Sequence, residues 1–235
     1  MVLATRFRFA TTHRLLGWVC LLLSACSICP KLAQATTAPL AAAEHATPAA
    51  GAQLRIEAGT TYSGTIVVSS DSVTISNYGT LAGTIVVSAG VKGTIINNLG
   101  AVTSQTIYLN SPTTINNGSA AAPAASWTGY IGDNFGKAIT INNFAEFAGE
   151  IYTLPGGTLH NQRGATWAGY IHHCPAPLAI TNDGTWQAPL AATGRLRIVN
   201  NGLWDSNLLA NRSAVITNAG SWPSRQVAAQ PARRQ

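Results

Sequence analysis

The residues best suited to chemistry are the run His172-His173-Cys174 and, one strand earlier, His160. Imidazole and thiolate groups are ligands that zinc prefers, and a structural zinc site takes four ligands. Neighbouring residues in a strand point to opposite faces, so His172 and Cys174 could share a side while His173 could not. Two ligands on one side, without a third, are too few for a zinc site. We therefore expect surface histidines and no bound metal.

Acidic residues offer a second kind of chemistry, because glycoside cleavage needs clustered carboxylates and other sugar-cleaving sites need a base beside calcium ligands. The chain lacks a G-x-S-x-G elbow, a P-loop and a G-x-G-x-x-G motif. After residue 50 its acids are scattered, with no D-x-D or D-D pair: Glu57, Asp71, Asp133, Glu146, Glu150, Asp183 and Asp205. We expect no catalytic residues, no enzyme activity and no cofactor.

The formal net charge of +6 is concentrated near the N-terminus. Four of the 14 basic residues lie before residue 36, which leaves 10 against 8 acidic residues in the rest of the chain. Such a nearly neutral body does not present a phosphate-binding surface, so we expect no nucleic-acid partner.

Residues 1–35 have the pattern of an export signal, in which basic residues precede an apolar run, Leu15 to Ala25, that is too short to span a bilayer. Two cleavage positions fit. Ala33-Gln34-Ala35 has the small-x-small pattern of an ordinary signal peptidase site. The Leu-Ser-Ala-Cys segment at 23–26 resembles the bacterial lipobox; the signal would then end at Ala25, and Cys26 would be lipidated. Both remain open, and any membrane contact would be through Cys26.

One phrase recurs along the chain: apolar-x-Asn-x-Gly-x-bulky-x-small. Ile or Leu stands two residues before every asparagine of the row. The asparagines are Asn77, Asn98, Asn117, Asn143, Asn161, Asn182, Asn200 and Asn218. The bulky residues after them, spaced by 18 to 25 positions, are Leu81, Val102, Trp127, Phe147, Trp167, Trp186, Trp204 and Trp222.

The positions of the phrase share one parity, so in an extended chain they point to one face. A repeat of about 20 residues with this alternation is typical of one turn of a parallel β-helix. Ile and Trp rows would stack into a linear core, and each asparagine could bond to those about 4.8 Å above and below. A β-sandwich is the alternative, although it does not require the same residues in every repeat.

The phrases ISNYGTLAGTI, IINNLG, ITINNFAEFAGEI, ITNDGTW and IVNNGLW resemble the repeats of right-handed β-helical bacterial surface proteins, such as filamentous-haemagglutinin-like adhesins and autotransporter passenger regions. The resemblance covers about residues 52–222. It implies an all-β, right-handed parallel β-helix, of about eight or nine coils by the repeat count, that is exported, surface-associated and non-enzymatic. It supplies no ligand.

The flanking segments differ in composition from the repeats. Residues 36–51 are rich in Ala, Pro and Thr and predict a linker, and residues 223–235 predict a disordered basic tail. We expect a structural or adhesin-like module, secreted or at the cell surface or outer membrane of a bacterium. Its partner would be a surface glycan or another surface protein, and Tyr130, Tyr152 and Tyr170, opposite in parity to the Trp row, could contact carbohydrate. The alternative is a degenerate carbohydrate-active β-helix enzyme or a glycan-binding module.

Overall fold

The chain forms short strands in which buried and outward side chains alternate. The computed structural model describes residues 37–40, 45–104, 106–132, 137–210, 213–223 and 227–229. The expected export signal, Cys26 and Asp133 lie outside these residues. Among the described residues there is no helix, and hence none long and apolar enough to cross a membrane.

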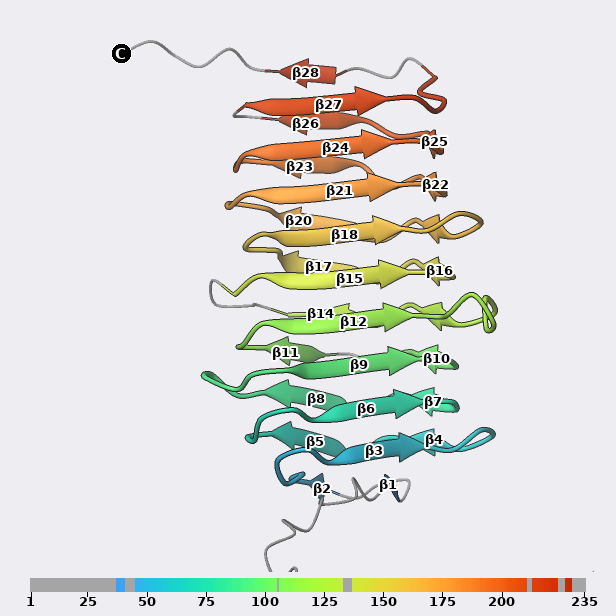
Figure 1. Ribbon diagram of the computed structural model, residues 1–235, viewed down its shortest axis with the longest axis vertical. Helices are drawn as coiled ribbons and strands as arrows, with labels where there is room; N and C mark the ends of the chain where they lie inside the picture. The colour runs from blue at the N-terminus through green and yellow to red at the C-terminus, as the bar shows by residue number, and fades with distance from the viewer. Residues whose placement is uncertain are drawn as a thin grey trace, which may run out of the picture. The chain divides into compact units, whose positions relative to one another are not determined.

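In the described part of the chain, eight coils each contribute one strand to each of three parallel sheets, and two of the sheets have one further strand at each end (Figure 1). Sheet A contains the longest strands: β1 Thr37–Pro39, β3 Gln53–Ile56, β6 Thr74–Asn77, β9 Thr94–Asn98, β12 Thr113–Asn117, β15 Ile139–Asn143, β18 Gly157–Asn161, β21 Leu178–Asn182, β24 Leu196–Asn200 and β27 Ala214–Asn218. Sheet C contains two-residue strands: β4 Thr61–Tyr62, β7 Thr80–Leu81, β10 Ala101–Val102, β13 Ser126–Trp127, β16 Glu146–Phe147, β19 Thr166–Trp167, β22 Thr185–Trp186 and β25 Leu203–Trp204. Sheet B contains β2 His45–Ala46, β5 Thr65–Val68, β8 Thr84–Val87, β11 Ile107–Leu109, β14 Tyr130–Ile131, β17 Glu150–Thr153, β20 Tyr170–His173, β23 Leu190–Ala192, β26 Leu208–Ala210 and β28 Val227–Ala229.

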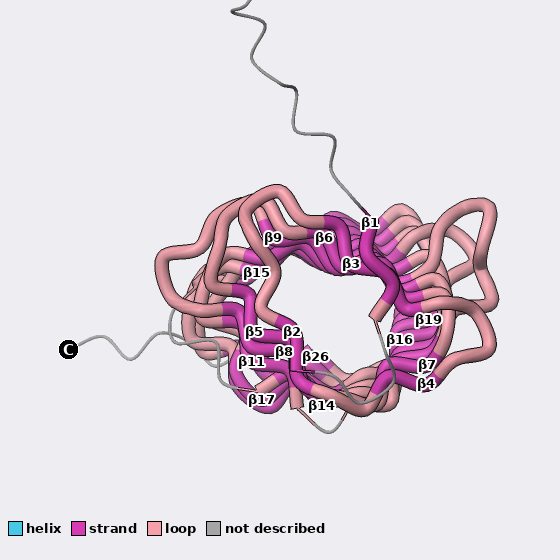
Figure 2. The backbone as a smooth tube through the Cα atoms, turned by 90° about the horizontal axis from the view of Figure 1, so that it is seen from below, coloured by secondary structure: helices cyan, strands magenta, loops and turns pink. Residues whose placement is uncertain are grey.

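The three sheets surround one axis, as the view along that axis shows (Figure 2). Every strand pairs in parallel with its counterpart in the next coil, so the chain winds through A, C and B in turn. The prediction of an all-β solenoid is confirmed: the coils number about eight and are consistent with a right-handed parallel β-helix.

Stacked rows of apolar side chains fill the interior. The Ile row pairs in exact register along sheet A, for example Ile96 with Ile115 and Ile115 with Ile141. On sheet C, six rings stack with centroids 4.2–5.5 Å apart and ring planes within 18°, from Trp127 through Phe147 to Trp222. Since no single coil can bury these faces, the core exists only because the coils stack.

Glycine follows the asparagine where successive coils approach closely. At Gly202 a Cβ atom would overlap the carbonyl oxygen of Gly184 in the coil below. A larger residue there would force the coils apart at the corner between sheets A and C, which explains the Gly of the repeated phrase.

The solenoid extends beyond residues 52–222 at both ends. β1 and β2 lie in the segment expected to be a linker, where they pair with β3 and β5. β28 lies in the expected disordered tail and pairs with β26. Pairing on an existing sheet edge uses backbone groups, so it does not require the apolar alternation on which the sequence prediction depended.

Candidate functional site

The eight asparagines of the repeat form a continuous ladder at the corner between sheets A and C. The Nδ2 of each of the first seven donates to the Oδ1 of the next asparagine at 2.7–2.8 Å. Each of the first seven also donates to a backbone carbonyl in the following coil, as Asn161 does to Thr185 at 2.9 Å. These seven are fully buried. The ladder joins the turns of successive coils, and its hydrogen-bonding groups face one another rather than solvent.

The histidine and cysteine residues do not come together. His172 and His173 are exposed, whereas Cys174 is fully buried, because the chain turns inward after β20. The expectation that His172 and Cys174 could share a side is therefore wrong. Burial raises the pKa of the Cys174 thiol to about 11, and His160 lies on a different sheet. Within the described ranges, no three His, Cys, Asp or Glu residues are grouped so that they could hold a metal ion.

A polar cluster surrounds His160 at the outer edge of sheet A. His160 Nε2 lies 2.8 Å from Asp183 Oδ2, and its Nδ1 lies 2.8 Å from Gln162 Nε2. Asn201 Nδ2 donates to Asp183 Oδ1 at 2.7 Å. The hydrogen bonds from Asn201 and then His160 hold the pKa of Asp183 below its usual range. Both ring nitrogens and both carboxylate oxygens thus have partners within the cluster.

Aromatic rings gather on the outer face of sheet B. We call this group the aromatic surface; it comes from β11, β14, β17 and β20 and consists of Tyr108, Tyr130, Tyr152, Tyr170 and His172. The rings of Tyr108, Tyr152 and Tyr170 are 41%, 48% and 41% exposed. Large rings held at the surface mark a place where a molecule can cover them.

Contacts between the rings connect four members of the aromatic surface, from Tyr130 to Tyr170. The centroid of Tyr152 lies 6.5 Å from that of Tyr130 and 6.0 Å from that of His172. His172 meets Tyr170 edge-on at 4.6 Å. At the other end, a Cβ atom on Gly132 would lie 3.0 Å from two atoms of the Tyr108 ring, so this glycine leaves space for the ring.

A carboxylate is held within the aromatic surface. Glu150 lies between Tyr130 and Tyr170 in the register of sheet B. Its Oε2 is 3.1 Å from His172 Nε2. The side chains of His172 and Glu150 are 39% and 57% exposed, so a ligand could hydrogen-bond to either of them.

A groove of about 550 Å³ borders the aromatic surface on the side towards sheet C. Tyr130 of the aromatic surface lines this groove together with Glu150, which places the rings and the groove next to each other. The remaining walls are hydroxyl-bearing or small residues, namely Thr103, Ser104, Thr106, Thr128 and Ala148. The site therefore combines flat rings with a polar channel.

Sequence reasoning named Tyr130, Tyr152 and Tyr170, and the structure places all three on this face. It missed Tyr108 and assigned His172 no part in the aromatic surface. An alignment of the repeats on the inward Ile row of sheet B would have placed Ile107, Ile131, Ile151 and Ile171 in register and their outward neighbours together. Tyr108 was obscured because the corner between Val102 and Ile107 is one residue longer than the corner that follows Trp127, Phe147 or Trp167. His172 could have been found, since it follows Trp167 by five residues as Tyr152 follows Phe147.

Comparison with known proteins finds no matching family model, no matching curated protein and no matching solved structure. The fold itself is shown to be a parallel β-solenoid.

Proposed function

We propose that this chain is an exported, non-catalytic surface or extracellular module of a bacterium, and that its aromatic surface binds a glycan. The observation that carries the proposal is the connected row of rings, most of them exposed, beside a hydroxyl-lined groove. Export and an adhesin-like role draw their support from the pattern of residues 1–35 and from the repeat phrases.

A glycan fits the chemistry of this face. The C–H face of a sugar ring is apolar and packs on a tyrosine ring, while its hydroxyl groups need acceptors and donors close by. Here Glu150 and His172 supply both within the ring cluster, and the threonines of the groove supply more. Because the rings span four successive strands, a ligand of several sugar units would contact more of them than a monosaccharide would.

The test is a glycan array with the purified chain, followed by calorimetric titration of any glycan that binds. Replacing Tyr152 and Tyr170 together with Ala should weaken binding roughly fivefold or more, because ring contacts contribute ~0.5–1.5 kcal/mol each. Tyr78→Ala is the matched control. It is also an exposed tyrosine, at 37%, but it lies where sheet A ends, with the Arg55 guanidinium 4.2 Å from its ring centroid. Absence of glycan binding, or an equal loss in the control, would overturn the proposal.

Two further measurements separate the parts of the proposal. The first is an assay for reducing or unsaturated sugars released from polysaccharide. If the parent protein releases such sugars and Glu150→Gln does not, the non-catalytic assignment is wrong. Mass spectrometry of the exported protein distinguishes the two cleavage positions: a free Thr36 excludes the lipid anchor, and a lipidated Cys26 as first residue establishes it.

A further inference from the structure

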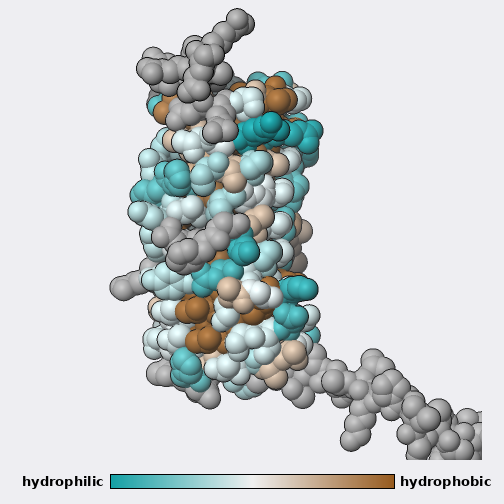
Figure 3. Space-filling model, turned by 90° about the vertical axis from the view of Figure 1, so that its left-hand side faces the viewer, coloured by the Kyte–Doolittle hydropathy of each residue, from teal (hydrophilic) through white to brown (hydrophobic). Residues whose placement is uncertain are grey.

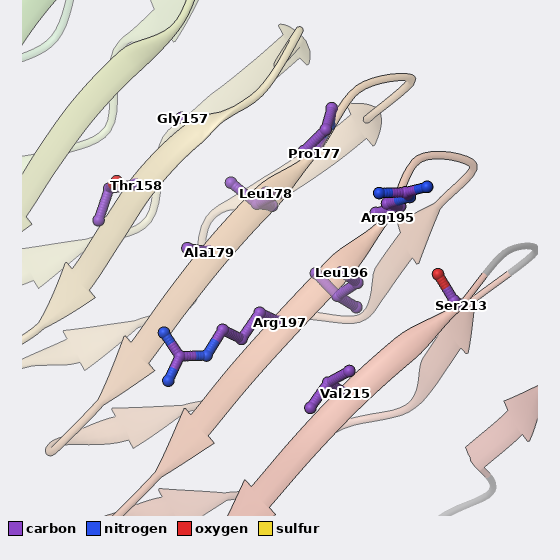
Figure 4. A pocket seen from close by; sticks show the side chains of 10 residues that line it. All are labelled: Gly157, Thr158, Pro177, Leu178, Ala179, Arg195, Leu196, Arg197, Ser213 and Val215. Carbon is purple, nitrogen blue, oxygen red and sulfur yellow. The ribbon is translucent and has the colours of Figure 1, made fainter.

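A second groove, of about 610 Å³, crosses the outer face of sheet A in the C-terminal coils (Figure 4). It runs along the solenoid axis over β18, β21, β24 and β27. This groove is on a different sheet from the aromatic surface, so the two sites share no residue.

The floor of this groove is lowest at Ala179, the smallest side chain of one outward row. One outward row pairs Thr158 with Ala179, Ala179 with Arg197, and Arg197 with Val215. Ala179 therefore leaves a depression between two longer neighbours. The exposed Pro177 and Val215, the latter 62% exposed, make the walls apolar. Figure 3 faces the side where the strands of sheet A begin and shows hydrophobic groups there in only a few areas, one of them near the C-terminal end.

Two arginines provide the charge. Arg195 and Arg197 stand on either side of the buried Leu196, and both are exposed. The ion pairs of the described residues are Arg55–Glu57, His160–Asp183 and His172–Glu150, so neither arginine has a carboxylate partner there. In Figure 4 the guanidinium groups of Arg195 and Arg197 point away from each other, and no carboxylate lies among the lining side chains.

We infer that this groove binds an acidic polypeptide segment, with one apolar side chain over Ala179 and carboxylates paired with Arg195 and Arg197. Guanidinium groups pair with carboxylates in a fixed, bidentate geometry, which gives such a segment its register. A polypeptide is favoured over an acidic glycan because no aromatic ring lines this groove and its walls are mostly apolar. The C-terminal residues 230–235 carry Arg233 and Arg234 and no acid, so they do not complement the groove.

The experiment measures fluorescence anisotropy of the full chain with a labelled dodecapeptide of repeating Glu-Val-Glu, beside an otherwise identical Gln-Val-Gln peptide. The acidic peptide should bind at least tenfold more tightly than the amide peptide. Raising NaCl from 50 to 500 mM should weaken binding severalfold, because exposed charge pairs are screened.

Variants assign the binding to the groove. Replacing Arg195 and Arg197 together with Gln should reduce affinity at least tenfold, whereas Arg163→Gln, an exposed arginine between β18 and β19, should not. Ala179→Glu should also block the peptide, because it fills the depression and places a carboxylate beside Arg197. Absence of peptide binding, or a peptide affinity unchanged by the Arg195/Arg197 variant, overturns the inference. Oligogalacturonate binding that requires both arginines, with no peptide binding, would assign the groove to a glycan instead.

Discussion

Replacing Asn161 with Ala removes an interior rung of the asparagine ladder. The side chain is fully buried, and its Nδ2 donates to Asn182 Oδ1 at 2.8 Å and to the Thr185 carbonyl at 2.9 Å. Its Oδ1 accepts from Asn143 Nδ2 at 2.8 Å. Alanine removes all three hydrogen bonds and leaves the Asn182 oxygen without this donor.

The size of the effect follows from these contacts. A net contribution of about 1 kcal/mol per hydrogen bond gives ~3 kcal/mol for the three bonds. The buried acceptor left on Asn182 adds about 1 kcal/mol or more, since its desolvation is no longer compensated. We therefore expect Asn161→Ala to lower the free energy of unfolding by roughly 4 kcal/mol or more.

Urea unfolding followed by far-UV circular dichroism and by tryptophan fluorescence measures this difference. Asn218→Ala is the matched control, because this asparagine ends the row, is exposed, and accepts a single ladder bond from Asn200 at 2.7 Å. The control should lose about 1 kcal/mol or less. If both variants lose the same amount, or Asn161→Ala loses under 1 kcal/mol, the ladder does not hold the coils together as argued.

Three further outcomes follow from buried or paired side chains. Trp186→Ala should lower the free energy of unfolding by about 3–5 kcal/mol and Trp186→Phe by less, because this fully buried ring stacks on both sides at 5.0 and 4.7 Å; urea titration measures both. Burial raises the pKa of Cys174 from 9.0 to about 11, so at pH 8 the folded protein should contain roughly 100-fold less thiolate and react far more slowly with Ellman's reagent than the urea-unfolded chain. Hydrogen bonds from Asn201 and His160 lower the pKa of Asp183 in the folded protein, so its stabilising contribution is present above the ordinary value of 3.8 and lost as pH falls through the folded value. Thermal melts should therefore show Asp183→Asn less stable than the parent at pH 7, with a deficit that shrinks below pH 3.8; a deficit independent of pH would contradict this.

The inward rows could be predicted from the sequence because they repeat. Ile115, Asn117 and Trp127 each have a counterpart of the same kind in neighbouring coils, so their spacing gave the coil length, the buried face and the sheet they stack in. The prediction of which side chains face inward failed at a corner whose residues are not repeated from coil to coil. Cys174 follows two exposed histidines at a corner, and strict alternation placed it on the wrong side.

The outward rows show where a solenoid of this kind can acquire a binding surface. On sheet B the outward row holds Thr65 and Thr84 in two early coils, then Tyr130, Glu150 and Tyr170 in three successive later ones. Inward positions change in size but carry no charged residue in the described coils, because each side chain must fit in the dry interior between the ones above and below it. An outward position meets solvent, so stacking neither requires nor forbids a tyrosine there. A change of residue class along an outward row is consequently a feature that stacking does not explain, and it occurs both at the aromatic surface on sheet B and at Arg197 on sheet A.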